Sequence, residues 1–246
     1  MGKPYKLLAL DMDGTLLNEK SEISDANERW IREAIDAGIA VCFATGRGYA
    51  SALPFAQRLA LTSPMVLVNG GEVWASPDRL HSRETMPAED IVSLRDIALR
   101  YDTWYWGYSV DRVFNKNDWL EDPFSTEWLK FGFFTEDEAA LAAVAADVLA
   151  LPRPFETTNS HPNNLELNPL GVSKASGLRQ VCAMLGCDMR EVVACGDSLN
   201  DAAMIREAGL GVAMGNAQDA VKRIADAVTL TNEEDGVAHV IRTYLL

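Results

Sequence analysis

The feature that most constrains the fold is a short apolar run, Leu7–Leu10, which ends in two acids at Asp11 and Asp13. The run has the length and composition of a buried β-strand. In open α/β sheets, ligands bind at the carboxyl ends of the strands. Two carboxylates this close repel by about 1 kcal/mol in water and about 4 kcal/mol at an effective dielectric constant of 20. A divalent cation is the simplest group that offsets this repulsion, so the run indicates a metal site.

Two other structures contain stretches of this kind. An Asp-x-Asp-Gly segment also forms a solvated turn, and the segment alone does not separate that turn from a metal site. A calcium loop of the EF-hand type requires glycine at its sixth position, where counting from Asp11 gives Leu16. The apolar strand before Asp11 also argues against a helix–loop–helix unit. The choice between a turn and a metal site depends on what else reaches this strand end.

Short apolar runs alternate with amphipathic segments at both ends of the chain. Each run is apolar throughout, as expected for parallel strands that are covered on both faces. The predicted strands after the first are residues 39–44, 66–68, 192–195, 210–214 and 227–230. The predicted helices include residues 24–37, a helix ending at Leu59, residues 173–186 and 218–225, and a last helix from about Asp235. The alternation predicts an α/β fold with a doubly wound, mostly parallel sheet.

The pattern changes between residues 82 and 167. Alternating polar and apolar residues predict a sheet with one face packed on helices. The predicted strands are residues 103–108, 112–115, 128–135, 155–158 and 164–167, and the predicted helices are residues 91–100 and 136–149. We therefore predict a core formed by residues 1–81 and 168–246, with an inserted α+β domain at 82–167. The aromatic run Trp104-Tyr105-Trp106 is expected to lie in the core and interface of this insert.

Polar residues also follow two further strands and begin one helix. The strand at 39–44 ends in Thr45-Gly46-Arg47, which suits either a phosphate cradle or a plain strand-to-helix turn. The strand at 192–195 ends in Gly196-Asp197-Ser198-Leu199-Asn200-Asp201. Lys174 begins a helix, where its charge opposes the macrodipole unless it shares an anion; the alternative is a solvated surface lysine. Clustered carboxylates beside such groups suit Mg²⁺-assisted phosphoryl transfer.

Charge and composition narrow the classes of partner. The net charge of −14 disfavours nucleic acid and anionic membranes as main partners, while a small anionic substrate stays compatible with it. No apolar run reaches about 18 residues, so no membrane span is expected, and residues 1–6 show no signal-peptide pattern. Three widely spaced histidines do not predict a zinc site. Four cysteines without metal-ligand spacing are typical of reduced core residues in a cytoplasmic protein: Cys42, Cys182, Cys187 and Cys195.

These polar segments together resemble the four motifs of the haloacid dehalogenase (HAD) superfamily. The matching residues are Asp11-Met12-Asp13-Gly14-Thr15, Thr45-Gly46-Arg47, Lys174 and Gly196-Asp197-Ser198-Leu199-Asn200-Asp201. The insert between the second and third motifs, and the phrase Ala213-Met214-Gly215-Asn216-Ala217, are similar to those of its Cof-type, subclass IIB phosphatases. The resemblance implies a HAD-type Rossmannoid core with an α+β cap domain that determines substrate specificity.

The resemblance implies a role for each matching residue. Asp11 would be the nucleophile that forms an aspartyl-phosphate, and Asp13 would be the general acid and then the general base. Asp11, Asp13 (through its main-chain carbonyl) and Asp197 would hold Mg²⁺. Asp201 and Ser198 would support the metal from nearby. The residues that would bind the phosphoryl group are Met12, Thr45, Gly46, Lys174 and Asn200.

The resemblance implies a Mg²⁺-dependent phosphatase of small phosphate monoesters, such as sugar phosphates or similar metabolites. We expect a monomer or a small homo-oligomer, with a cap that excludes water and macromolecules when it closes. Two alternatives stay open: a phosphomutase or phosphotransferase that uses the same aspartyl-phosphate, and a non-catalytic phosphometabolite-binding protein. Specificity residues are expected around Asp111 and in the 115–127 connection, including Trp119.

Overall fold

The computed structural model describes residues 5–246 and divides into two compact units. One unit is formed by Met1–Ser82 and Lys174–Leu246, and the other by Arg83–Ser173. Residues 1–4, part of the segment for which no signal peptide is expected, lie outside the described residues. None of the helices in residues 5–246 has the length and apolar character needed to cross a membrane.

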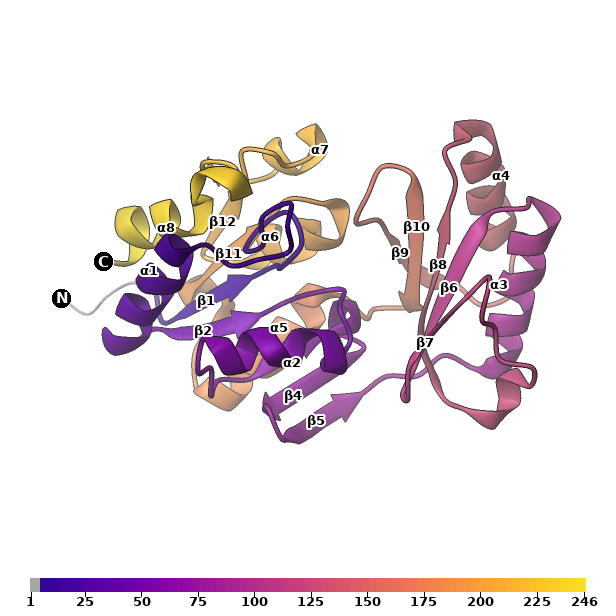
Figure 1. Cartoon of the computed structure of the whole chain (residues 1–246), viewed down its shortest axis with the longest axis horizontal. Helices are drawn as coiled ribbons and strands as arrows, with labels where there is room; N and C mark the ends of the chain where they lie inside the picture. Colours follow the sequence, from indigo (N-terminus) through magenta and orange to yellow (C-terminus); the bar gives the residue numbers. More distant parts are fainter. Residues whose placement is uncertain (1–4) are drawn as a thin grey trace. The chain divides into compact units, whose positions relative to one another are not determined.

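A parallel five-stranded sheet forms the middle of the first unit, in the order β13-β12-β11-β1-β2 (Figure 1). Its strands are β1 (Leu7–Leu10), β2 (Ala40–Phe43), β11 (Val192–Gly196), β12 (Leu210–Ala213) and β13 (Ala227–Val228). Leu10 pairs with Phe43 on one side and with Cys195 on the other. This register brings the residues that follow β1, β2 and β11 to one edge of the sheet, as the parallel prediction requires.

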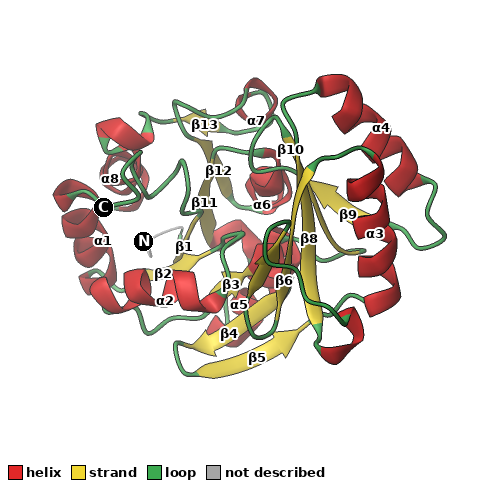
Figure 2. Ribbon diagram, turned by 45° about the vertical axis from the view of Figure 1, so that its right-hand side comes forward, coloured by secondary structure: helices red, strands yellow, loops and turns green. Residues whose placement is uncertain are grey.

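Helices cover both faces of this sheet, with α1 and α8 on one side and α5 and α6 on the other (Figure 2). These helices are α1 (Asp25–Asp36), α5 (Lys174–Leu185), α6 (Ala202–Glu207) and α8 (Gly236–Val240). Ser24 caps α1 by accepting a hydrogen bond from the Asn27 amide, and Gly38 ends the segment with a φ of +85°. Leu178 and Val181 of α5 share one hydrophobic core with Leu7 of β1, which buries the apolar stripe of this helix. The doubly wound prediction is therefore confirmed.

A second, antiparallel sheet in this unit differs from the prediction. Strand β3 (Met65–Leu67) pairs with β4 (Glu72–Ser76), which is followed by β5 (Arg79–Arg83), and an isolated bridge between Ala44 and Val66 links β3 to the parallel sheet. The β4–β5 hairpin was not predicted, because its exposed polar residues lack a clear apolar alternation. The predicted strand at 66–68 ends one residue early, at Leu67. The remaining helices are α2 (Tyr49–Arg58) and α7 (Asp219–Lys222), and the latter is shorter than the predicted 218–225.

The second unit is an antiparallel sheet in the order β7-β6-β8-β10-β9, with two helices. The strands are β6 (Trp104–Ser109), β7 (Val113–Asn115), β8 (Trp128–Phe134), β9 (Phe155–Thr158) and β10 (Asn164–Pro169), and the helices are α3 (Ala88–Arg100) and α4 (Glu138–Leu149). Tyr105, Phe131 and Leu167 share a hydrophobic core with Ile91 and Leu94 of α3. The predicted α+β pattern is thus observed, with both helices packed into one core.

Aromatic residues of the second unit divide between the two faces of its sheet. Tyr105 is buried in the helix-covered core, whereas Trp104 is 39% exposed, because successive strand residues point to opposite faces. Trp106 lies across Gly132, where a Cβ atom would come within 2.3 Å of the indole ring. Trp119, predicted as a specificity residue, stacks on Trp128 with ring centroids 5.3 Å apart. Its packing partners place Trp119 in the aromatic core.

Candidate active site

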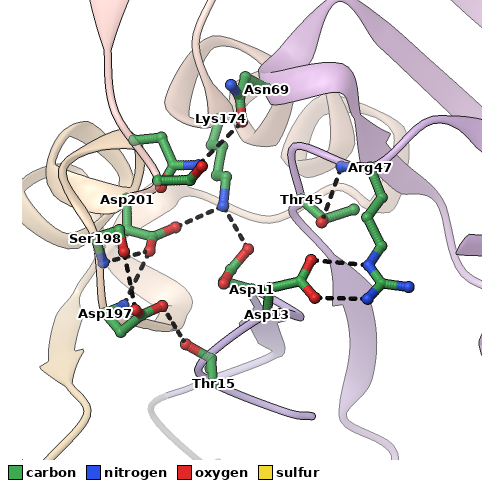
Figure 3. A network of polar contacts seen from close by, with 12 residues as sticks. Asp11, Asp13, Thr15, Thr45, Arg47, Asn69, Lys174, Asp197, Ser198 and Asp201 are labelled. Carbon is green, nitrogen blue, oxygen red and sulfur yellow. Dashed lines mark hydrogen bonds and ion pairs between the residues drawn. The ribbon is translucent and has the colours of Figure 1, made fainter. Parts of the chain in front are cut away.

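The candidate site lies at the carboxyl edge of the parallel sheet (Figure 3). Asp11 follows β1 and donates its backbone N–H to the carbonyl of Cys195, 3.0 Å away. This hydrogen bond continues the pairing of β1 with β11. Thr45 follows β2, and Asp197 follows β11. The buried apolar strands therefore place Asp11, Thr45 and Asp197 at one edge of the sheet, although these residues are far apart in the sequence.

A buried lysine joins two carboxylates at the centre of the site. Lys174 Nζ lies 2.5 Å from Asp11 Oδ1 and 2.7 Å from Asp201 Oδ1. Lys174 and Asp201 are 0% exposed and Asp11 is 5% exposed. The alternative of a solvated surface lysine at position 174 is therefore wrong. These two anions offset the unfavourable placement of Lys174 at the start of α5.

Asp201 organises the loop after β11. Its Oδ2 atom accepts hydrogen bonds from the backbone N–H groups of Asp197 and Ser198, at 2.9 and 3.1 Å. The approach is close because position 196 is glycine: a Cβ there would lie 2.3 Å from the Asp201 carboxyl carbon. With one oxygen on Lys174 and the other on two amides, Asp201 has both oxygens occupied. It shapes the loop more than it offers a free ligand atom.

Asp197 presents its carboxylate from this loop toward β1. Ser198 Oγ donates to Asp197 Oδ2 at 2.8 Å, and Thr15 Oγ1 donates to Asp197 Oδ1 at 3.3 Å. Gly14 has a φ of +76°, and a Cβ at this position would come within 2.6 Å of Asp197 Oδ2. Glycine at position 14 thus provides both the left-handed backbone and the space for this carboxylate.

The donor set fits a hard divalent cation. Oxygen atoms of Asp11, Asp197 and Asp201 all lie within 4.8 Å of one another. Three carboxylates surround a single ammonium group, which leaves an excess of negative charge in a buried place. Mg²⁺ and Ca²⁺ prefer such oxygen ligands, and Mg²⁺ is commonly held by one or two carboxylates together with substrate phosphate.

The excess negative charge also shifts the pKa values of the site. Burial, reinforced by Asp201 and Asp197, raises the pKa of Asp11 well above its usual value, and Lys174 opposes this rise. Burial and the nearby Asp201 raise the pKa of Asp197 to about 7. Burial disfavours the charge of Lys174, yet Asp11 and Asp201 outweigh it and raise the Lys174 pKa. Because their pKa values are raised, the carboxyl groups of Asp11 and Asp197 hold protons more tightly without a cation than free aspartates do.

Asp13 lies apart from the buried carboxylates. Its side chain is 59% exposed and accepts two hydrogen bonds from Arg47, at 2.8 Å from Nε and 2.5 Å from Nη2. Arg47 in turn donates its backbone N–H to Thr45 Oγ1 at 3.2 Å. Arg47 belongs to the segment that suits a phosphate cradle by sequence, but its contact with Asp13 was not predicted. The structure assigns it a contact with Asp13, in the bidentate geometry typical of arginine and carboxylate.

The other predicted phosphate-binding residues lie in the segments that follow β1, β2 and β11. Met12 is buried, and its carbonyl accepts the Leu17 N–H at 2.8 Å, which closes the turn after β1. Thr45 is buried at the end of β2, beside the half-buried Gly46. Asn200 lies in the 3₁₀ turn Leu199–Asp201 and donates from Nδ2 to Asn69 Oδ1 at 3.2 Å.

Two further residues of the site were not predicted. Asn69 contacts Asn200, and Asn216 Nδ2 donates to the carbonyl of Gly14 at 2.8 Å. The Asn69-Gly70-Gly71 and Gly215-Asn216 segments were visible as turn-forming residues after strands. Their side-chain contacts depend on how those turns fold, which residue type alone does not specify.

The family profile of the haloacid dehalogenase-like hydrolases matches residues 8–241 of this chain. The chain is 46% identical over 241 residues to 5-amino-6-(5-phospho-D-ribitylamino)uracil phosphatase YcsE of Bacillus subtilis, covering 98% of this chain and 96% of the relative. It is 34% identical over 267 residues to the B. subtilis phosphatase YitU, whose name gives the same substrate, covering 98% of each. The structure of the HAD subclass IIB sugar phosphatase BT4131 has the same fold, with a TM-score of 0.84 at 22% identity, covering 96% of this chain and 98% of that one.

The chain therefore belongs to the haloacid dehalogenase-like hydrolases, and the resemblance drawn from its motifs is confirmed. Within that family it is a phosphatase.

Proposed function

We propose that this protein is a Mg²⁺-dependent phosphatase that hydrolyses small phosphate monoesters through an aspartyl-phosphate on Asp11. The observation that carries the proposal is the buried ion pair between Lys174 and Asp11, with Asp197 and Asp201 close by. The carboxylate of Asp11 is buried between the Lys174 ammonium group and two further carboxylates. This arrangement has the three components that phosphoryl transfer requires. It offers a nucleophile, a positive charge for phosphate oxygens and ligands for a metal ion.

The metal would be held by the carboxylates of Asp11 and Asp197 and by the main-chain carbonyl of Asp13. The occupied oxygens of Asp201 suit a supporting role, because they orient the loop that carries Asp197. Ser198 supports the same carboxylate through its hydroxyl. When bound, Mg²⁺ would neutralise charge on the phosphoryl group and on these carboxylates.

In the first half of the reaction, an Asp11 carboxylate oxygen attacks phosphorus, and the bond from phosphorus to the leaving-group oxygen breaks. Asp13 gives its proton to that oxygen, so the leaving group departs as an alcohol. Lys174, Thr45, the Gly46 amide and Asn200 would bind the phosphoryl oxygens, because all are hydrogen-bond donors: Lys174 contacts Asp11, and the others follow β2 or β11 at the carboxyl edge of the sheet. Their positive charge and dipoles stabilise the transition state where negative charge is spread over those oxygens.

In the second half, water attacks the phosphorus of the aspartyl-phosphate. Asp13, now ionised, takes the proton of that water, the acyl-phosphate bond breaks, and inorganic phosphate and free Asp11 result. Arg47 contacts both oxygens of Asp13 and so keeps its carboxylate in place for proton transfer. When Asp13 carries a proton, its carbonyl oxygen still accepts a hydrogen bond from the guanidinium, so Arg47 can orient Asp13 in both halves of the reaction.

We propose residues 83–173 as the domain that determines substrate specificity. Tyr108, Lys130 and Glu166 form a polar and aromatic group on strands of this unit. Lys130 Nζ lies 4.6 Å from the centre of the Tyr108 ring and 3.2 Å from Glu166 Oε2. Trp106, which lies across Gly132, and Tyr108 are half-buried, so their rings suit the planar part of a small substrate, while the Lys130–Glu166 pair is buried.

The names of two relatives suggest what that substrate is. Both act on 5-amino-6-(5-phospho-D-ribitylamino)uracil, which joins a phosphorylated sugar alcohol to a planar heterocycle. We propose this compound as the first substrate to test, within the wider class of sugar phosphates and similar metabolites. We also propose that the enzyme acts in the cytoplasm, where a reducing environment suits its four free cysteines.

The test is release of inorganic phosphate in the presence of Mg²⁺, from that compound, from a panel of metabolite phosphates and from p-nitrophenyl phosphate. Asp11→Asn is expected to lower kcat at least about 10³-fold while the protein stays folded. Arg29→Ala, on the exposed surface of α1, is the matched control and keeps the full rate. An Asp11→Asn protein that retains most of its activity contradicts the proposal.

A further inference from the structure

The turn after β3 carries a backbone conformation that its residues rarely adopt. Val68 has a φ of +53° and Asn69 a φ of +57°. Left-handed conformations are uncommon for residues with a Cβ, and for β-branched residues such as valine they are outliers. Both residues are buried, so the surrounding structure holds the conformation in place. Strain of this kind gathers at functional sites, where the geometry is needed for something else.

The backbone of this turn is fastened to the loop after β2. The Val68 N–H donates to the carbonyl of Arg47 at 3.0 Å, and the Asn69 N–H donates to the carbonyl of Thr45 at 2.9 Å. The left-handed conformation turns both N–H groups toward that loop. Thr45 and Gly46 are proposed phosphoryl ligands, and their loop is thus held by the strained turn.

The side chain of the same residue reaches a second loop. Asn69 Oδ1 accepts the hydrogen bond from Asn200 Nδ2 at 3.2 Å, beyond the end of β11. The Asn200 carboxamide is buried, and its Oδ1 atom accepts no hydrogen bond from residues 5–246. The contact with Asn69 therefore sets which way the Asn200 amide faces. One hydrogen of Nδ2 is taken by Asn69, and the other is left to donate to a phosphoryl oxygen.

We infer that Asn69 is a positioning residue that aligns two phosphate-binding loops, holding Thr45 through its backbone and Asn200 through its side chain. The inference rests on the proposed function, in which Thr45 and Asn200 contact the phosphoryl group. Asparagine suits both tasks, because it tolerates a positive φ better than other residues with a Cβ and carries an oxygen acceptor. Asn69 itself need not touch the substrate.

The first experiment compares Asn69→Gly with the parent enzyme. Glycine keeps the left-handed backbone without strain and removes only the side chain, so the protein is expected to fold normally. Asn69→Gly should raise both KM for p-nitrophenyl phosphate and Ki for inorganic phosphate about three- to tenfold, the size of effect expected from losing the hydrogen bond to Asn200. Because Asp11 and Asp13 are untouched, kcat should change less than about threefold.

Two further variants separate the side chain from the backbone. Asn69→Ala should weaken phosphate binding as much as Asn69→Gly and should also lower the melting temperature, because alanine is strained at this φ. Ser21→Gly is the matched control: Ser21 has a φ of +58° in an exposed turn outside the proposed site. It should leave Ki for phosphate unchanged.

A double-mutant cycle tests the route through Asn200. In the Asn200→Ala background, adding Asn69→Gly should raise Ki less than twofold further, because the amide that Asn69 orients is already gone. Equal effects of Asn69→Gly in both backgrounds, or an unchanged Ki in the single variant, overturn the inference. An active Asp11→Asn enzyme overturns the proposed function instead, so the two failures are distinguishable.

Discussion

Arg47 donates hydrogen bonds to both carboxylate oxygens of Asp13, one from Nε at 2.8 Å and one from Nη2 at 2.5 Å. Asp13 is otherwise an exposed side chain, so this contact restricts its orientation. The guanidinium is itself placed by its packing over Phe55, with Cζ 5.4 Å from the ring centre. In the proposed mechanism Asp13 transfers protons and must be aimed at the reacting oxygen, and the contact with Arg47 would provide that aim before the substrate arrives.

Arg47→Ala is therefore expected to affect substrates unequally. An alkyl phosphate needs a proton on its leaving oxygen, so kcat/KM should fall about tenfold or more. For p-nitrophenyl phosphate, whose leaving group departs easily without a proton, the fall should be at most about threefold. Arg47→Lys keeps the charge but loses the bidentate contact and serves as the comparison. An equal loss on both substrates would assign Arg47 to phosphate binding.

Lys174→Met should destabilise the protein strongly. The substitution keeps a long apolar stem but leaves Asp11 and Asp201 buried without a counter-charge. Breaking a buried ion pair in this way costs about 3–5 kcal/mol of unfolding free energy. Urea denaturation without metal measures the loss, and Lys6→Met, which removes a largely exposed lysine, is the control. Unchanged stability in Lys174→Met would contradict the role of this pair.

Gly14→Ala should weaken Mg²⁺ binding. The new Cβ would press on Asp197 Oδ2, which would lie 2.6 Å away, and would displace the carboxylate. Gly38→Ala is a close control, because Gly38 has a similar φ of +85° but no atom within 4 Å of the added carbon. Alanine is strained at both positions, because both have a positive φ. Only Gly14→Ala should require a higher Mg²⁺ concentration for half-maximal activity. The same Mg²⁺ requirement in both would separate Gly14 from the metal site.

Mg²⁺ affinity should rise with pH around neutrality. Metal-free Asp197 has a pKa of about 7, so at pH 6 a proton must leave before the carboxylate binds a cation. One such proton makes binding at pH 8 about tenfold tighter than at pH 6. For the metal-free protein, this raised carboxyl pKa means that stability falls as pH rises from about 4 through about 7. Calorimetric titration with Mg²⁺ checks the first claim, and affinity that is flat with pH would refute it.

Trp106→Ala should alter substrate preference without altering phosphate binding. We expect a higher KM for a substrate with a planar leaving group and an unchanged Ki for inorganic phosphate, because Trp106 belongs to the second unit. Leu149→Ala, at a position 86% exposed on α4, is the control. If Trp106→Ala binds every substrate as the parent does, the specificity role proposed for this sheet face is wrong.

The sequence predicted best those features that depend on neighbouring residues or on a regular apolar pattern. Apolar strands predicted the parallel sheet, and the parallel arrangement alone placed Asp11 and Asp197 at one edge. The contacts of Asn69 and Asn216 could not be predicted from the sequence, because they depend on the backbone angles of turns, and a periodic pattern of residues does not specify those angles. The packing of Trp119 was hidden for a related reason: its segment looks like a connection, yet the aromatic ring packs against the core of its unit, and its role in specificity stays a prediction.

The order of the strands has a consequence for how the chain is made. β1 pairs with β2, made soon after it, and with β11, which follows the whole second unit. Asp11 leaves the ribosome 163 residues ahead of Lys174, so it first meets its counter-charge late in synthesis. Residues 83–173 form one continuous segment with its own core and can fold while β1 still has an open edge. Translation thus completes the second unit before Asp11 and Lys174 can pair, and a truncated chain ending before Lys174 would carry the proposed nucleophile without its counter-charge.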